Sequence, residues 1–398
     1  MKNKFLFLLF AIAPLALAAD EISDAEEIDI PAVETKSAQL TYQQQRKVFQ
    51  YRGYLVSELG FIPNPKSNSL TKGSGIGEAN LAFTYRPLSS ISLFSDTLAS
   101  YFAPSANTQL IFAQAGLRIQ PTETISLAFG RERNFRAPGL LINPSDIIHP
   151  SQNVPGQRMQ RAGVWLARAS YQTRPLTIDA MFLPYNNLTA NGLPFETESK
   201  DFGGVGRLFL VTGIGDFGVT GGYFNQLWQL GTFYSSYLVR KLETHAELGI
   251  SQSQRARALI GSRLDIGSSS SFTLEGYFNN RGLSKDEFEA GLKKTTTQSV
   301  STQAFSGSAT ASFNLFPRRW YTIASVSSTD ILNLFNLSLS EVLGLEDFSS
   351  LTFFRWDWLV SDQSTLALLL IAIHGPRDGQ YGARPLDYRW GAEWRINF

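Results

Sequence analysis

The sequence predicts an all-β fold in which about 18 antiparallel strands close into a transmembrane β-barrel. Three observations lead to this prediction. Segments of about ten residues alternate between apolar and polar side chains, and clusters of turn residues separate these segments. In addition, the longest apolar run after the N-terminal region, 366–373, has only eight residues, whereas a helix needs about 20 to cross a bilayer.

Composition agrees with this fold class. Charged residues make up 17% of the 398-residue chain and hydrophobic residues 43%, whereas soluble proteins carry about 25% charged residues. The 35 basic and 34 acidic residues give a net charge of +1, so the sequence offers no basic surface for nucleic acid. The absence of cysteine is compatible with an oxidising compartment.

The N-terminus has the pattern of a cleaved signal peptide over residues 1–18. Lys2 and Lys4 precede an apolar run over 5–17, and the small residue Ala18 ends a cleavage pattern. A buried helix or an uncleaved anchor is the alternative. The signal peptide predicts that the mature chain works outside the cytoplasm.

Residues 19–48 are expected to form a separate periplasmic arm. The segment is acidic at first and contains three consecutive glutamines over 43–45. A short plug helix is the alternative. The barrel itself is predicted over 49–398.

The last segment of the chain shows the alternation most clearly. Arg389, Gly391, Glu393, Arg395 and Asn397 lie on one face of a strand with period two. The opposite face is apolar and is the predicted assembly signal, formed chiefly by Tyr388, Trp390, Trp394, Ile396 and Phe398. A soluble β-sandwich would also alternate. However, tryptophan and tyrosine near the segment ends are typical of the aromatic girdles of a membrane barrel.

The connections between predicted strands alternate in length, which also favours a membrane barrel. Eight connections are short, including one at Pro317–Arg319 that follows a strand predicted over 305–316. The longer ones are predicted at 132–160, 185–201, 281–304, 328–350 and 375–387. Short turns are expected in the periplasm and long loops outside the cell. Segment 328–350 could instead hold a helix or a further hairpin, and 16 strands are the alternative count.

The aromatic alternation that ends in Phe398 resembles the assembly signal of bacterial outer-membrane porins, and the pattern over 49–398 is similar to the porin superfamily. Gly130-Arg131-Glu132-Arg133, followed by Asn143-Pro144-Ser145-Asp146, resembles a strand end and loop of porin-like families. This resemblance implies an outer-membrane location in a Gram-negative-type bacterium. It also implies lipopolysaccharide and the barrel-assembly machinery as partners, and a homotrimer as one oligomeric state.

A barrel of 16–18 strands is too wide to be filled by its wall side chains. Narrowing would therefore come from an inward-folded loop, and 132–160 is the best candidate because it mixes charged with apolar residues. The constriction residues that we expect are Arg131, Arg133, Arg136, Asp146 and His149. A loop that caps the rim is the alternative.

Strand parity also predicts which wall charges face the lumen. The main candidates are Arg168, Arg207, Arg255, Arg257, Arg263, Glu275, Arg355 and Asp357. Arginine holds carboxylates in fixed geometry, so cross-strand ion pairs are the simplest interpretation. An anion ladder at Arg255, Arg257 and Arg263 is the alternative. Because cations and anions nearly balance, strong ion selectivity is not expected.

The predicted function is passive diffusion of small hydrophilic solutes through a water-filled channel. Two alternatives are a specific channel or exporter for anionic solutes or carbohydrate polymer, and a non-conducting assembly or adhesion barrel. No cofactor, metal site or enzyme activity is predicted. None of His149, His245 and His374 has an outward serine partner of the kind that a lipid hydrolase needs.

Overall fold

The computed structural model describes ten stretches of the chain: 49–63, 70–103, 107–133, 137–148, 163–184, 202–224, 227–253, 255–287, 318–376 and 388–398. The predicted signal peptide and arm, 1–48, lie outside the described residues. Within those residues, no helix is long and apolar enough to cross a membrane.

The described residues form eighteen strands and almost no helix, with only 285–287 helical. The strands are β1 (Phe49–Pro63), β2 (Leu70–Leu88), β3 (Ile91–Ala103), β4 (Asn107–Ile119), β5 (Ile125–Glu132), β6 (Val164–Gln172), β7 (Leu176–Leu183), β8 (Gly203–Thr212), β9 (Gly215–Phe224), β10 (Leu227–Val239), β11 (Leu242–Ser251), β12 (Ala256–Ile266), β13 (Ser270–Asn279), β14 (Trp320–Ile331), β15 (Phe335–Gly344), β16 (Ser350–Ser361), β17 (Ser364–His374) and β18 (Tyr388–Asn397).

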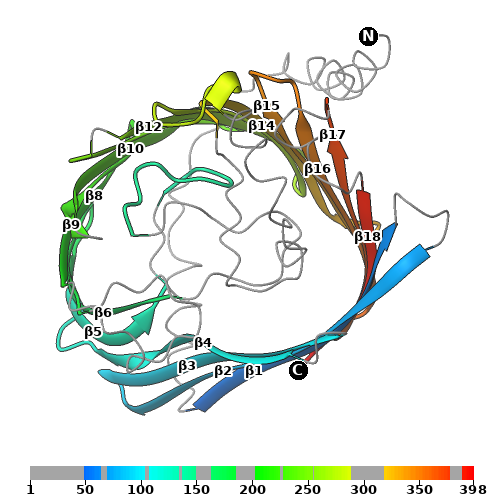
Figure 1. The fold of residues 1–398 in the computed structure, drawn as a ribbon. Coiled ribbons are helices and arrows are strands. Elements are labelled where there is room, and N and C mark those ends of the chain that lie inside the picture. The colour runs from blue at the N-terminus through cyan, green and yellow to red at the C-terminus, as the bar shows by residue number, and fades with distance from the viewer. Residues whose placement is uncertain are drawn as a thin grey trace, which may run out of the picture. The chain divides into compact units, whose positions relative to one another are not determined.

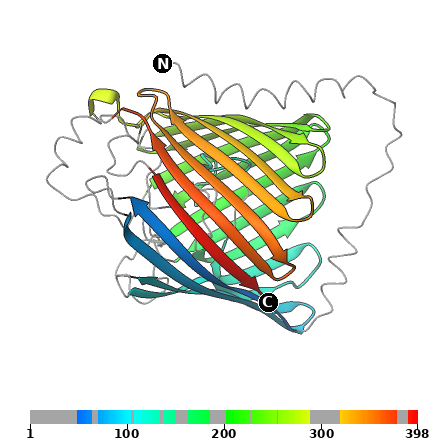
Figure 2. The ribbon, with the colours of Figure 1, turned by 90° about the vertical axis from the view of Figure 1, so that its right-hand side faces the viewer.

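Each strand pairs antiparallel with the next, and β18 pairs with β1, so the sheet has no free edge (Figure 1). Figure 2 shows the strands tilted along the wall, as closure requires. The predicted all-β barrel and its count of 18 strands are confirmed. Phe398 exchanges backbone hydrogen bonds with Gly53, at 2.9 and 3.0 Å, so the chain end completes the closing seam.

The alternation in the sequence becomes the two faces of the wall. On β16, Trp356 and Trp358 are exposed on the outside, whereas Arg355 and Asp357 point inward and form an ion pair. Neighbouring strands repeat this arrangement because residues paired across strands share a face. The outer face is apolar over most of its rows, and the inner face carries the polar groups.

Long connections follow β5, β7, β13 and β17, whereas β3–β4, β9–β10 and β11–β12 are joined on the same side by connections as short as the turns at the other end. The predicted alternation in length therefore holds only in part, and one turn is placed differently from the sequence prediction. The sequence prediction placed a short turn before β14, at Pro317–Arg319, whereas the short turn in the structure follows β14, at Leu332–Leu334. The predicted loop 328–350 therefore contains strand β15. The further hairpin was therefore the correct alternative. The strand predicted at 305–316 lies outside the described residues, and β13 pairs directly with β14. Residues Leu332 and Asn333 form this turn in the left-handed region, without the glycine or proline that usually marks one.

Candidate functional site

Among the connections that the structure describes, one enters the barrel. Residues 137–148, which we call the lumen segment, lie inside the ring of strands against the inner wall (Figure 1). They belong to the connection between β5 and β6, the loop that the sequence singled out. Most of the segment is buried, including Leu141, Ile142, Ile147 and Ile148.

Two wall carboxylates hold the backbone of the lumen segment. Glu247 of β11 accepts hydrogen bonds from the Gly139 N–H at 2.8 Å, the Ser145 N–H at 3.1 Å and the Ser145 hydroxyl at 2.7 Å. Glu275 of β13 accepts one from the Leu140 N–H at 2.8 Å. Both carboxylates are at most 3% exposed. Because buried backbone N–H groups need acceptors, these two residues provide what the segment lacks inside itself.

Two wall glycines make room for the same stretch. A Cβ added at Gly231 of β10 would lie 2.0 Å from the Ser145 carbonyl oxygen, and one added at Gly249 of β11 would lie 2.0 Å from the Pro144 carbonyl oxygen. No real Cβ tolerates such a distance. The Asn-Pro-Ser-Asp stretch therefore sits directly on bare wall backbone, next to Glu247.

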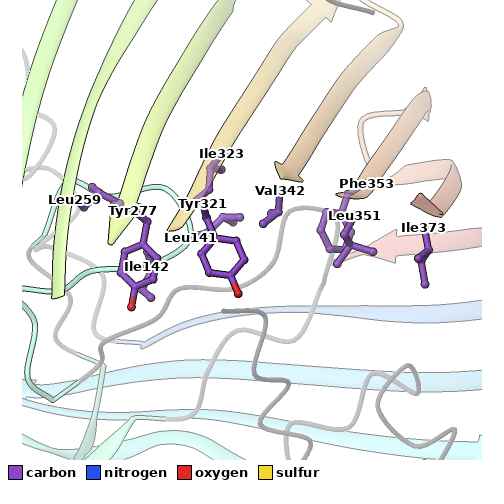
Figure 3. Packing of buried hydrophobic residues seen from close by; sticks show 10 residues of the cluster. All are labelled: Leu141, Ile142, Leu259, Tyr277, Tyr321, Ile323, Val342, Leu351, Phe353 and Ile373. Atoms are coloured by element: carbon purple, nitrogen blue, oxygen red, sulfur yellow. The ribbon is translucent and has the colours of Figure 1, made fainter. Parts of the chain in front are cut away.

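Apolar contacts fix the segment on both sides. Leu141 and Ile142 belong to a buried cluster on the inner wall of β12–β17, where Tyr277, Tyr321 and Ile323 are among its members (Figure 3). Ile147 and Ile148 join a second cluster, completed by Val164, Leu166, Met181, Leu183 and Val205. Burying each of these side chains stabilises the folded state by roughly 1.5–3 kcal/mol. The two clusters therefore hold the lumen segment firmly against the wall.

The strand end before the segment carries a run of charged residues with separate roles. Glu132 receives two hydrogen bonds from Arg168, each 2.9 Å long, and also pairs with Arg118. Arg133 pairs with Asp96 at 3.1 Å. Burial lowers the pKa of the Arg133 guanidinium, and Asp96 acts in the opposite direction.

The Arg131 side chain is buried and does not face an open lumen. The register places it in the outward row of Phe129, yet its side chain is buried and donates from Nε to the Gly163 carbonyl at 2.7 Å. It thereby ties the start of the connection to its end. Its part in a constriction stays a prediction, as do the roles of Arg136 and His149, which lie outside the described residues.

Most of the other predicted lumen charges are engaged in pairs. Arg207 contacts Asp146 of the lumen segment at 3.5 Å, so Asp146 is bound to the wall. Three more pairs are Arg168–Asp179 at 3.5 Å, Arg263–Asp265 at 3.0 Å and Arg355–Glu393 at 3.0 Å. Glu275 also contacts His245 at 3.1 Å. By contrast, Arg255 and Arg257 form no ion pair among the described residues.

Sequence reasoning missed the residues that receive the segment. Glu247, Gly231 and Gly249 each looked like ordinary wall positions, although an inward carboxylate beside inward glycines on adjacent strands is a signal that could have been used.

No cluster of metal-ligating side chains occurs in the described stretches.

The predicted assembly residues occupy the outer face of β18. Trp394, Ile396 and Phe398 are exposed, and Trp390 is half-buried. The backbone of Tyr388 lies in the strand, and nothing is described of its side chain. Their action as an assembly signal stays a prediction.

Comparison with known proteins shows which solved structures share this fold. No protein-family model and no curated protein matches the chain. Among solved structures, Acinetobacter baumannii OccAB4 aligns with a TM-score of 0.56 and 10% identity over 89% of this chain and 100% of that one. Pseudomonas aeruginosa OccK11 (OpdR) gives 0.54 and 10% over 88% and 96%, and OpdQ from the same species gives 0.54 and 9% over 88% and 98%. The chain therefore has the fold of a porin-like outer-membrane β-barrel.

Proposed function

We propose that this chain is an outer-membrane porin through which small hydrophilic solutes diffuse passively. The observation that carries the proposal is the division of the closed wall into an apolar outer face and a polar inner face. An apolar exterior suits lipid, and a barrel of this strand number has an interior wide enough for water.

The lumen segment is the proposed constriction. It occupies space inside the barrel and is fixed to the wall by Glu247, Glu275 and two apolar clusters. A rigid obstruction of this kind narrows a channel without closing it as a gate would. Arg133, which pairs with Asp96 at the start of the same connection, is the charged group that we expect nearest to passing solutes.

Weak ion selectivity is expected from the pairing of wall charges. A carboxylate held by an arginine, such as Glu393 by Arg355, presents little net charge to the lumen. Arg255 and Arg257 form no ion pair among the described residues, and they favour a second candidate function, a channel that prefers anionic solutes. They lie two residues apart on or beside β12, so both guanidinium groups share the inner face.

The remaining expectations follow from the same proposal. The barrel would stand in the outer membrane with its short turns in the periplasm, in contact with lipopolysaccharide. It would be inserted by the barrel-assembly machinery through the β18 signal, and three copies would associate. The residues before 49 would be the signal peptide and the periplasmic arm.

Planar-bilayer recording of the purified, refolded protein tests the proposal. A porin gives stepwise conductance that falls as polymers of increasing size enter the channel, with a reversal potential near zero in a salt gradient. A strongly anion-selective current would favour the second function. Folded protein without any conductance would contradict both and favour a non-conducting adhesion or assembly barrel.

A further inference from the structure

Hydroxyl side chains gather on the inner wall of β13–β15. Toward the short-turn end, this wall carries two rows of hydroxyl side chains that run across the three strands. Ser271, Ser327 and Ser338 are paired directly in the first row. Thr273, Ser325 and Ser340 form the second row in the same manner. Among the described inward residues of β14 and β15, none is charged.

Charged residues bound this patch on both sides. In the first row, Asp265 of β12 is paired with Ser271 across the strands, and Arg355 of β16 is paired with Ser338. Asp265 is held by Arg263, and Arg355 by Glu393. The charge-free gap is therefore three strands wide, and adjacent strands lie about 4.8 Å apart.

The two rows differ in exposure. The second row, which consists of Thr273, Ser325 and Ser340, is buried. Two residues beyond it, away from the short turns, the apolar cluster around the lumen segment begins at Ile323 and Val342. The first row is partly exposed. It thus lies just beyond the apolar contacts of the segment, toward the short-turn end of the barrel.

The hydroxyl groups retain hydrogen-bonding capacity. The Ser271 and Ser327 oxygens are 2.9 Å apart, so one hydroxyl donates to the other. The second proton of the pair and several lone pairs remain available. Because hydroxyl groups rotate freely, such a pair can donate or accept as a solute moves past. No charged group must be desolvated when it does so, which keeps binding weak and release fast.

On the basis of the proposed channel function, we propose that the row of Ser271, Ser327 and Ser338 is a contact site for uncharged, hydroxyl-rich solutes of the sugar and polyol class. Asp265 and Arg355 at its ends add an acceptor and a donor. A carbohydrate crossing the constriction would exchange hydrogen bonds with water for hydrogen bonds with this row. Anions and cations would find no unpaired charge there.

The test compares two sets of serine variants. The first is S271A/S327A/S338A, which removes the row. The matched control is S270A/S328A, because these two serines form an equivalent pair, 2.7 Å apart, on the outer face of the same strands. Each protein is refolded, checked for heat-modifiable mobility, and recorded in planar bilayers in salt while sucrose or raffinose is titrated.

The parent and the control should show a saturable sugar-induced decrease in current. The row variant should keep its salt conductance and need about 3- to 10-fold more sugar for half-saturation, as expected for the loss of a few neutral hydrogen bonds. A parent that conducts without sugar saturation, or a row variant that matches the control, would overturn the inference. Absence of any conductance would instead overturn the proposed channel. If the row variant does not refold, Ser338→Ala alone takes its place, with a smaller shift in the same direction.

Discussion

Ser145 donates two hydrogen bonds to Glu247, one from its backbone N–H at 3.1 Å and one from its hydroxyl at 2.7 Å. This contact joins a loop residue to a wall residue 102 positions away in the sequence. With the Gly139 N–H on the other carboxylate oxygen, it fixes the lumen segment in place. Five predictions follow from this arrangement and from the two faces of the wall.

Replacing Glu247 with alanine should loosen the lumen segment. The Gly139 and Ser145 N–H groups would lose their acceptor, at a cost of about 1–3 kcal/mol for each buried group left unsatisfied. We expect a lower thermal unfolding midpoint and a larger, noisier single-channel conductance. Glu243→Ala is the control, because Glu243 also faces inward from β11 but accepts its bond from Ser235, at 2.7 Å. Equal conductance of the two variants would show that Glu247 does not position the segment.

Adding a methyl group at Gly249 should displace the segment without removing any hydrogen-bonding group. The new Cβ of Gly249→Ala would overlap the Pro144 carbonyl oxygen, so either the segment or the strand must move. We expect altered conductance and reduced stability. Gly204→Ala serves as the control, since nothing lies within 4 Å of a Cβ there. A Gly249→Ala protein that behaves like the control would place the segment farther from the wall than the structure does.

The assignment of faces predicts opposite outcomes for adjacent residues of β2. Leu81 is exposed on the outer face, so Leu81→Arg should cost roughly 2–4 kcal/mol if it lies near the bilayer midplane. Ala82 points inward, between Arg52 and Asp96 on the neighbouring strands. Ala82→Arg should therefore be tolerated. Urea titration of folding in lipid vesicles measures both, and equal losses would contradict the register of β2.

The terminal aromatic residue should act in assembly more than in stability. Phe398→Ala keeps the backbone hydrogen bonds with Gly53, so the purified variant should refold in detergent almost as well as the parent. In cells, the amount of heat-modifiable protein in the outer membrane should fall several-fold, whereas Phe398→Tyr should preserve it. Unchanged levels of Phe398→Ala would remove the support for an assembly signal in β18.

Reversing the unpaired cations should change ion selectivity more than reversing a paired one. The double variant Arg255→Glu/Arg257→Glu places two anions in a low-dielectric passage, where they attract cations. Its reversal potential should shift toward cation preference. Arg118→Glu, at a position that is paired with Glu132, tests whether any charge change has this effect. If both variants shift equally, Arg255 and Arg257 hold no special place in the channel.

The sequence by itself determined the architecture of the wall. A strand has period two, so the alternation of Trp356 and Trp358 with Arg355 and Asp357 already assigned them to opposite faces. The predicted count of 18 included a strand at 305–316, outside the described residues, and lacked β15. The turn at Leu332–Leu334 was not predicted because it contains neither glycine nor proline, although its Asn333 and the preceding Asp330 both adopt the left-handed region. Strand β15 was therefore placed inside a predicted loop.

Only the tertiary structure decided what happens inside the barrel. Local patterns show that 132–160 mixes apolar and charged residues, but they cannot show which wall residues receive it. Glu247 and Gly249 are close to each other in sequence and distant from Ser145 and Pro144, so their meeting depends on closure of the whole sheet. Closure also decides which arginines form ion pairs, because an ion pair depends on cross-strand register. In the same way, it aligns Ser271, Ser327 and Ser338 in one row. These contacts arise between residues that the chain brings together only after the barrel has formed.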